Sequence, residues 1–108
     1  MSMSLLEFHV LLALADGALH GWAVAERVTA DSDGGLTPRA GSLYRVIARL
    51  IAAGYVAESR GEDDGPHPGL PRRYYALTAA GRRGLGEESA RLRRAAAVAQ
   101  KRLGESRS

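Results

Sequence analysis

The side chains with the clearest chemical potential lie between residues 34 and 50, where Ser42, Tyr44, Arg45 and Arg49 share one side of a helical pattern. The other side is apolar and consists of Leu43, Val46, Ile47, Leu50 and Ile51. Hydroxyl and guanidinium groups donate hydrogen bonds to base edges and phosphate oxygens, and an amphipathic helix can present them in the major groove of DNA. The segment therefore predicts a helix that reads DNA.

Turn-forming residues on both sides set the expected limits of this helix. Residues 31–35 are Asp, Ser and Gly, which break the preceding segment and supply glycine for positive φ. Pro38 suits a first-turn position, and Thr37 is the expected N-cap. Gly54 is the expected C-terminal stop.

The first turn of the expected helix carries the candidate DNA contacts. A helix N-terminus attracts phosphate and reaches deepest into a groove, so Thr37, Arg39 and Ser42 are candidates for phosphate or base-edge contacts. Gly41 permits a close approach of the backbone. Arg45 lies one turn further on, where an arginine can pair with guanine.

Two more helices are expected before the reading helix. Residues 4–15 are apolar almost all round, and a helix of that kind is buried on all sides. In a chain this small, such burial requires cover from a second chain or from a long C-terminal helix. Residues 21–31 form the second helix, with Val24 and Val28 on its inward side.

Two short strand patterns follow, at residues 55–60 and 72–77. Tyr75 and Leu77 share one face of the second strand by alternation, and we expect both to be core residues. Residues 61–71 contain three Gly and three Pro. This segment is too long for a tight hairpin, so it predicts a mobile loop.

A final helix is expected from an N-cap at Thr78 to about Leu103. Its seam residues recur at alternating spacings of four and three, and they are Leu85, Ser89, Leu92, Ala96, Ala99 and Leu103. Such a heptad seam, together with the apolar first helix, predicts a homodimer. The expected dimer interface consists of Leu5, Phe8, Leu12, Leu85, Leu92, Ala96, Ala99 and Leu103.

Composition limits the class of protein. At 108 residues, with 45% apolar and 25% charged residues, the chain is typical of a small folded protein. No apolar run approaches the roughly 18 residues of a membrane span, and the N-terminus does not have the pattern of a secretory signal. The absence of cysteine excludes disulfides and thiolate metal sites. We expect a cytoplasmic protein without metal or cofactor, whose net charge of +3 is compatible with nucleic acid.

Three helices, two strands joined by a long loop, and a last helix are the elements of a winged helix-turn-helix in their usual order. We therefore expect a mainly α fold with a small β-wing. The DNA-binding domain spans residues 1–78, and a C-terminal dimerisation helix with its tail spans residues 79–108.

Three motifs resemble those of a known family. Leu19-His20-Gly21-Trp22 is similar to a His-Gly-aromatic opening of the second helix, and residues 37–44 to a recognition-helix entry. Residues 72–81 are similar to a second wing strand and its turn into the last helix. The family is the PadR-like transcriptional regulators. The resemblance covers roughly residues 5–92, and the single last helix is that of the short-tailed branch.

The resemblance implies a homodimer that binds a palindromic operator in double-stranded DNA and usually represses a nearby gene. It also implies release by a small-molecule effector. The last helix has no aromatic residue, so we expect an effector site that is small and aliphatic, or none; Phe8 is a weak candidate for it.

The resemblance also assigns roles to individual residues. Tyr44 matches the family's tyrosine, which implies a phosphate contact through its hydroxyl. Arg39 and Arg45 stand where family members commonly have small residues or proline, so base preference does not transfer. From the wing, the basic residues can track phosphates or the minor groove, and they are Arg60, Arg72, Arg73 and His67.

The sequence also bears on two other classes of protein. A winged-helix protein-interaction module without specific DNA binding is the alternative, supported by the acidic run Glu62-Asp63-Asp64. An enzyme is disfavoured because the chain has no cysteine, its three histidines are far apart, and no glycine-rich phosphate loop follows a strand.

Overall fold

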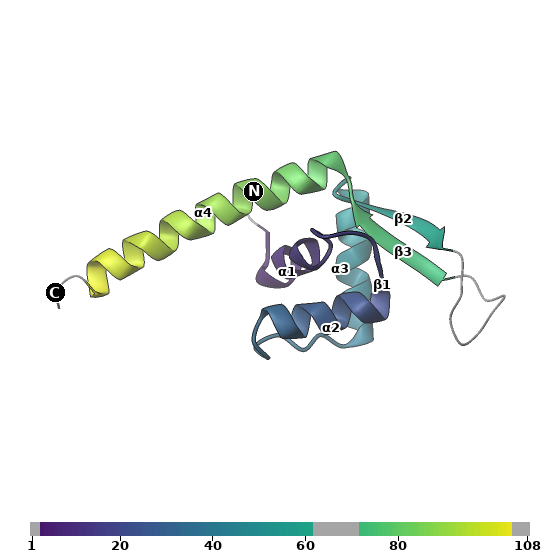
Figure 1. Cartoon of the computed structure of the whole chain (residues 1–108), viewed down its shortest axis with the longest axis horizontal. Helices are drawn as coiled ribbons and strands as arrows, with labels where there is room; N and C mark the ends of the chain where they lie inside the picture. Colours follow the sequence, from purple (N-terminus) through teal and green to yellow (C-terminus); the bar gives the residue numbers. More distant parts are fainter. Residues whose placement is uncertain (1–2, 62–71, 105–108) are drawn as a thin grey trace.

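The computed structural model describes residues 3–61 and 72–104, which form four helices and a three-stranded sheet. In chain order the elements are α1 (Leu5–Ala13), β1 (Leu19–His20), α2 (Gly21–Asp31), α3 (Ala40–Ala52), β2 (Val56–Gly61), β3 (Arg72–Leu77) and α4 (Ala79–Leu103). The first three helices pack together with the sheet at one end, and α4 extends the opposite way (Figure 1). This order confirms the mainly α fold with a small β-wing.

Local capping explains where three of the helices begin. Ser4 and Glu7 form a capping box at α1, with the Ser4 Oγ accepting from the Glu7 N–H at 3.0 Å and a Glu7 carboxylate oxygen accepting from the Ser4 N–H at 2.7 Å. His20 caps α2 through Nδ1, which accepts a backbone N–H at 3.3 Å. Thr78 caps α4 in the same way at 3.0 Å, as expected.

The start of α3 differs from the expectation. Arg39 is the N-cap, with φ −78° and ψ 158° and no side-chain cap bond, so the assignment of Thr37 as N-cap and Pro38 to the first turn is wrong. The connection is held instead by Ser32, whose hydroxyl accepts from the Leu36 N–H at 2.9 Å.

The sheet is antiparallel with strand order β1-β3-β2. β2 and β3 confirm the two expected wing strands. β1 pairs Leu19 with Tyr75 and His20 with Tyr74, and it was not expected because a two-residue strand carries no alternation. The acidic run at 62–64, His67 and most of the expected loop lie outside the described residues.

One apolar core joins α1, α2, α3 and the sheet. The predicted stripe of α3 is buried, through Leu43, Val46, Ile47 and Leu50. Tyr75 is buried and Leu77 packs against the same core, as expected. Burying one such side chain stabilises by about 1.5–3 kcal/mol, so this stripe determines which side of α3 faces outward.

Within one chain the apolar α1 is only partly covered. It ends at Ala13, earlier than expected, and packs against α2, α3 and α4. Leu5 is 59% exposed, and Phe8 and Leu12 are partly buried. Cover of the remaining surface by a second chain stays a prediction.

α4 has a docked half and a projecting half. Its start is tied to the turn after α3, where the Thr78 hydroxyl donates to the Gly54 carbonyl at 2.6 Å, and Leu85 packs against the core. All residues from 91 to 103 are exposed. The molecule therefore measures 60 × 27 × 22 Å with a radius of gyration of 16.3 Å, against about 13 Å for a compact chain of this size.

Candidate nucleic-acid interface

α3 presents three small groups of side chains outside its buried stripe. Because a helix advances about 100° per residue, Gly41, Arg45 and Ala48 lie opposite the stripe, and all three are exposed. Ser42 and Arg49 lie on the flank toward α1, and Tyr44 lies on the other flank. The four polar residues grouped by the sequence pattern therefore lie on the side of α3 away from the stripe, with Tyr44 at one edge and Ser42 at the other.

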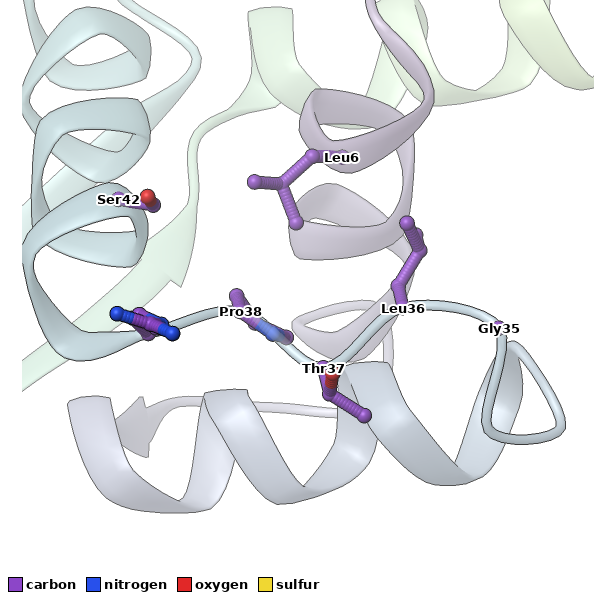
Figure 2. A pocket seen from close by; sticks show the side chains of 7 residues that line it. Leu6, Gly35, Leu36, Thr37, Pro38 and Ser42 are labelled. Carbon is purple, nitrogen blue, oxygen red and sulfur yellow. The ribbon is translucent and has the colours of Figure 1, made fainter.

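The flank toward α1 is engaged within the chain. Arg49 Nε lies 3.4 Å from a Glu7 carboxylate oxygen. Ser42 lines a hollow of about 340 Å³ whose apolar walls include Leu6 and Leu36. Figure 2 shows Leu6 and Leu36 directed toward this hollow, while the neighbouring Thr37 turns the opposite way from Leu36. These apolar contacts tie the start of α3 to α1.

Tyr44, on the other flank, reaches the start of α2. A Cβ placed on Gly21 would lie 2.7 Å from Tyr44 Cζ and 2.9 Å from Cε1, so only glycine leaves room for this ring. Tyr44 nevertheless stays 47% exposed. Gly21 belongs to the His-Gly-Trp motif of the sequence, but Tyr44 follows it 23 positions later. No local pattern connects the two residues, so sequence reasoning missed this contact.

The hydroxyl of Tyr75 belongs to the same region. Burial raises the pKa of Tyr75, and the charge of Glu58 and the nearby Tyr44 raise it further, while Arg73 partly offsets this. Tyr75 therefore stays neutral and is a packing residue of the core.

Four of the six arginines of the candidate site, Arg39, Arg45, Arg49 and Arg73, fall into two classes. Arg73 Nε lies 3.2 Å from a Glu58 carboxylate oxygen, and Arg49 is paired with Glu7. Arg39 and Arg45 form no ion pair with any residue that the structure describes. Two guanidinium groups, one at the N-cap of α3 and one at the centre of its outward side, are thus available for an anionic partner.

The wing strands bring basic residues together at the outer end of the hairpin. In the β2–β3 register Arg60 pairs with Arg73, and Gly61 pairs with Arg72. Three basic residues from two strands thereby lie on adjacent backbone positions. The structure gathers the wing part of the predicted site, except for His67, which is outside the described residues.

The predicted dimer residues occupy different environments. Leu85 packs against the core of its own chain. Leu92, Ala96, Ala99 and Leu103 are exposed along the projecting half of α4.

Within residues 3–61 and 72–104, no group of three or more metal-ligating side chains is arranged around a common point. The helices found there are all too short or too polar to cross a membrane.

A helical core whose second and third helices lead into an antiparallel β-hairpin defines a winged helix-turn-helix protein. The sequence profile of the transcriptional regulator PadR-like family matches residues 10–87, and the chain belongs to this family.

Solved structures agree with this assignment. The chain is similar to a PadR family transcription regulator from Clostridium difficile R20291, with a TM-score of 0.78, 18% identity, and coverage of 94% of this chain and 100% of that one. It is also similar to a PadR family regulator from Eggerthella lenta, with a TM-score of 0.67, 29% identity, and coverage of 88% and 80%.

Bacillus subtilis PadR, crystallised in complex with operator DNA, aligns with a TM-score of 0.66 and 18% identity over 78% of this chain and 46% of that one. A search of curated proteins returned no match.

Proposed function

We propose that this chain is a sequence-specific DNA-binding transcriptional regulator that acts as a homodimer on a palindromic operator and represses a nearby gene. The observation that carries the proposal is a pair of exposed arginines, Arg39 at the N-cap of α3 and Arg45 on its outward side, which have no ion-pair partner among the described residues. A regulator of this kind works in the cytoplasm, beside the chromosome.

The neighbours of Arg45 suit a helix that lies deep in the major groove. Gly41 precedes it by one turn and Ala48 follows by one turn, so small groups lie beside the arginine along the outward side, and Arg49 is its one large neighbour a turn further on. A Cβ on Gly41 would meet no atom of this chain within 4 Å, so the glycine is not required by packing. In such a groove Arg45 can pair in bidentate fashion with guanine, and the methyl of Ala48 can contact a thymine methyl.

Phosphate contacts would surround this reading residue. Thr37, Arg39 and Ser42 lie at or before the N-terminus of α3, where backbone N–H groups and the helix dipole favour an anion. The paired Arg49 and Arg73 can also take part, because an exposed ion pair contributes only about 0–1 kcal/mol and exchanges readily for a phosphate. The similar Bacillus subtilis PadR was crystallised with operator DNA, which supports DNA as the partner.

The projecting half of α4 supports the homodimer. The side chains from residue 91 to residue 102 are all exposed, so this part of the helix offers surface to a second chain, and small residues such as Ala96 and Ala99 allow a second helix to approach closely. Two copies would place two α3 helices on half-sites roughly 34 Å apart, which is the geometry of a palindrome.

A small-molecule effector is part of the proposal in a limited form. No aromatic residue lies on α4, so a flat aromatic compound would find no stacking surface there. We therefore expect any effector to be small and aliphatic.

The proposal is tested by an anisotropy titration of the protein against the DNA that flanks its own gene, at two salt concentrations and with scrambled competitor. Specific regulation predicts tight binding that outlasts the competitor and weakens steeply with salt, since each phosphate contact releases counterions. Binding lost equally to competitor would refute sequence specificity. No binding at either salt concentration would favour the protein-interaction module.

A further inference from the structure

The largest exposed aromatic group of the chain lies outside the residues assigned above. Trp22, in the first turn of α2, is 67% exposed, although its indole ring has much apolar surface to bury. It is also the only tryptophan in the sequence. A single exposed apolar side chain is ordinary on a protein surface, so only its surroundings can indicate whether Trp22 belongs to a binding site.

Trp22 stacks on one aromatic ring, and a second ring packs against that one. It stacks on His20 with ring centroids 6.2 Å apart and planes inclined by 10°, and Tyr74 of β3 packs edge-on against His20 at 5.9 Å and 83°. His20 itself is fixed by its cap bond to the Ala23 N–H. These three residues, His20, Trp22 and Tyr74, form an aromatic cluster that orients the indole before any partner binds.

The cluster offers hydrogen-bond donors. The indole Nε1 of Trp22 can only donate, and since Nδ1 of His20 accepts the cap bond, the neutral ring carries its proton on Nε2. The first turn of α2 contains no acidic residue, and the first carboxylate along this helix, Glu26, comes one turn later. Donors on a flat apolar body suit a partner that is an acceptor, such as a phosphodiester beside its deoxyribose.

The position of the cluster connects the two parts of the candidate DNA interface. Its neighbour Gly21 lies directly against Tyr44 of α3, and Tyr74 belongs to the wing strand that carries Arg73, although these two consecutive side chains lie on opposite faces of the strand. β1 and the start of α2 lie beside α3 and the β2–β3 hairpin, away from the end toward which α4 projects (Figure 1). A partner chain that pairs through α4 would leave this surface open.

We propose that the aromatic cluster is a DNA-backbone contact between the reading helix and the wing, in which Trp22 donates its indole N–H to a phosphate and packs on the adjacent sugar. The contact rests on the proposed function, because it requires that α3 lies in the major groove. It carries no base information, so it contributes affinity and orientation alike for all sequences.

The experiment uses Trp22 as its own probe. Acrylamide quenching of its fluorescence is measured for the free full-length protein and for its complex with the operator, while anisotropy of labelled DNA reports complex formation independently. We expect quenching to fall clearly when DNA binds. Unchanged quenching in a complex that anisotropy shows to be formed would overturn the contact while leaving the proposed function intact; absence of any complex would overturn both.

Two variants separate the roles of the ring and its N–H. Trp22→Ala is expected to weaken operator and scrambled DNA alike by about three- to tenfold, and Trp22→Phe, which keeps a ring on His20, to recover part of the loss. Thermal unfolding checks that both variants fold, and the exposure of the side chain predicts little change. Wild-type affinity in Trp22→Ala would refute the contact. A second result would also refute the contact. If acrylamide quenching of Trp22 in DNA-free protein falls as the protein concentration rises, the surface around Trp22 is covered by a second protein chain instead of by DNA.

Discussion

Replacing Gly81 by alanine tests how α4 is joined to the rest of the protein. A Cβ at this position would meet the backbone carbonyl of Tyr55, with the carbonyl carbon at 2.9 Å and the Cα at 3.1 Å. These are main-chain atoms of the turn between α3 and β2, so the clash cannot be relieved by a change of side-chain rotamer. The first turn of α4 must move away from the turn instead.

The expected cost follows from two opposing effects. Overpacking against a rigid neighbour costs about 1–3 kcal/mol, and moving the helix also weakens the bonds from Thr78 to Gly54 and Tyr55, which measure 2.6 and 3.0 Å. Alanine in place of a helical glycine returns only about 0.5–1 kcal/mol. We expect a net loss of about 2 kcal/mol, which lowers the melting temperature by roughly 10 °C.

Gly86 provides the matched control on the same helix. A Cβ there would meet nothing within 4 Å, so Gly86→Ala should gain helix propensity without a clash. Its melting temperature should rise by a few degrees, in keeping with about 0.5–1 kcal/mol. Both variants are followed by circular dichroism during thermal unfolding, at several protein concentrations because a dimer's melting temperature depends on concentration.

The test is whether Gly81→Ala melts at a lower temperature than Gly86→Ala. If Gly81→Ala melts as high as Gly86→Ala, the close contact between α4 and Tyr55 does not exist as described. A loss in both variants would instead mean that Gly86 is covered, for example by a second chain on α4.

Three further predictions concern DNA binding and pH. Arg45→Ala should cost about 1–3 kcal/mol in operator affinity and relax preference at one base position, which a set of single-base operator variants measured by anisotropy would reveal; untouched affinity would remove Arg45 from the reading role. Arg73→Ala should weaken binding to all sequences alike and lower the salt slope by about one, whereas a changed base preference would mean that the wing reads sequence. Because the pKa of Tyr75 is raised above its ordinary 10.0, its contribution to stability is complete below that pH and is lost as pH rises through the raised value. Urea unfolding at increasing pH should therefore show wild type losing stability relative to Tyr75→Phe above pH 10.0, and parallel curves would contradict the buried, neutral hydroxyl.

The helical elements were largely predictable because their signals are local. The buried stripe of α3 from Leu43 to Leu50 repeats with helical spacing, and Thr78 caps α4 through a bond to a residue three positions on. Residues that interact over three or four positions stand close together in the sequence, so their pattern can be recognised without the structure. The three family motifs added the order of the winged helix, which composition and periodicity alone do not specify.

The start of α3 was mispredicted for a physical reason. Proline is favourable both in a first helical turn and in an extended segment just before a helix, so Pro38 by itself does not choose. The choice was made by the connection, in which Ser32 holds Leu36 and Leu36 packs against the core.

By itself the sequence determined the apolar stripes of α2 and α3, the cap of α4 at Thr78, and that basic residues gather around the reading helix. Only the tertiary structure decided which of those arginines are held by carboxylates, that Gly21 makes room for Tyr44, and that Gly81 lies on the Tyr55 carbonyl. The reason is range: propensity and capping act within about four residues, whereas these contacts join residues that become neighbours only when the core forms.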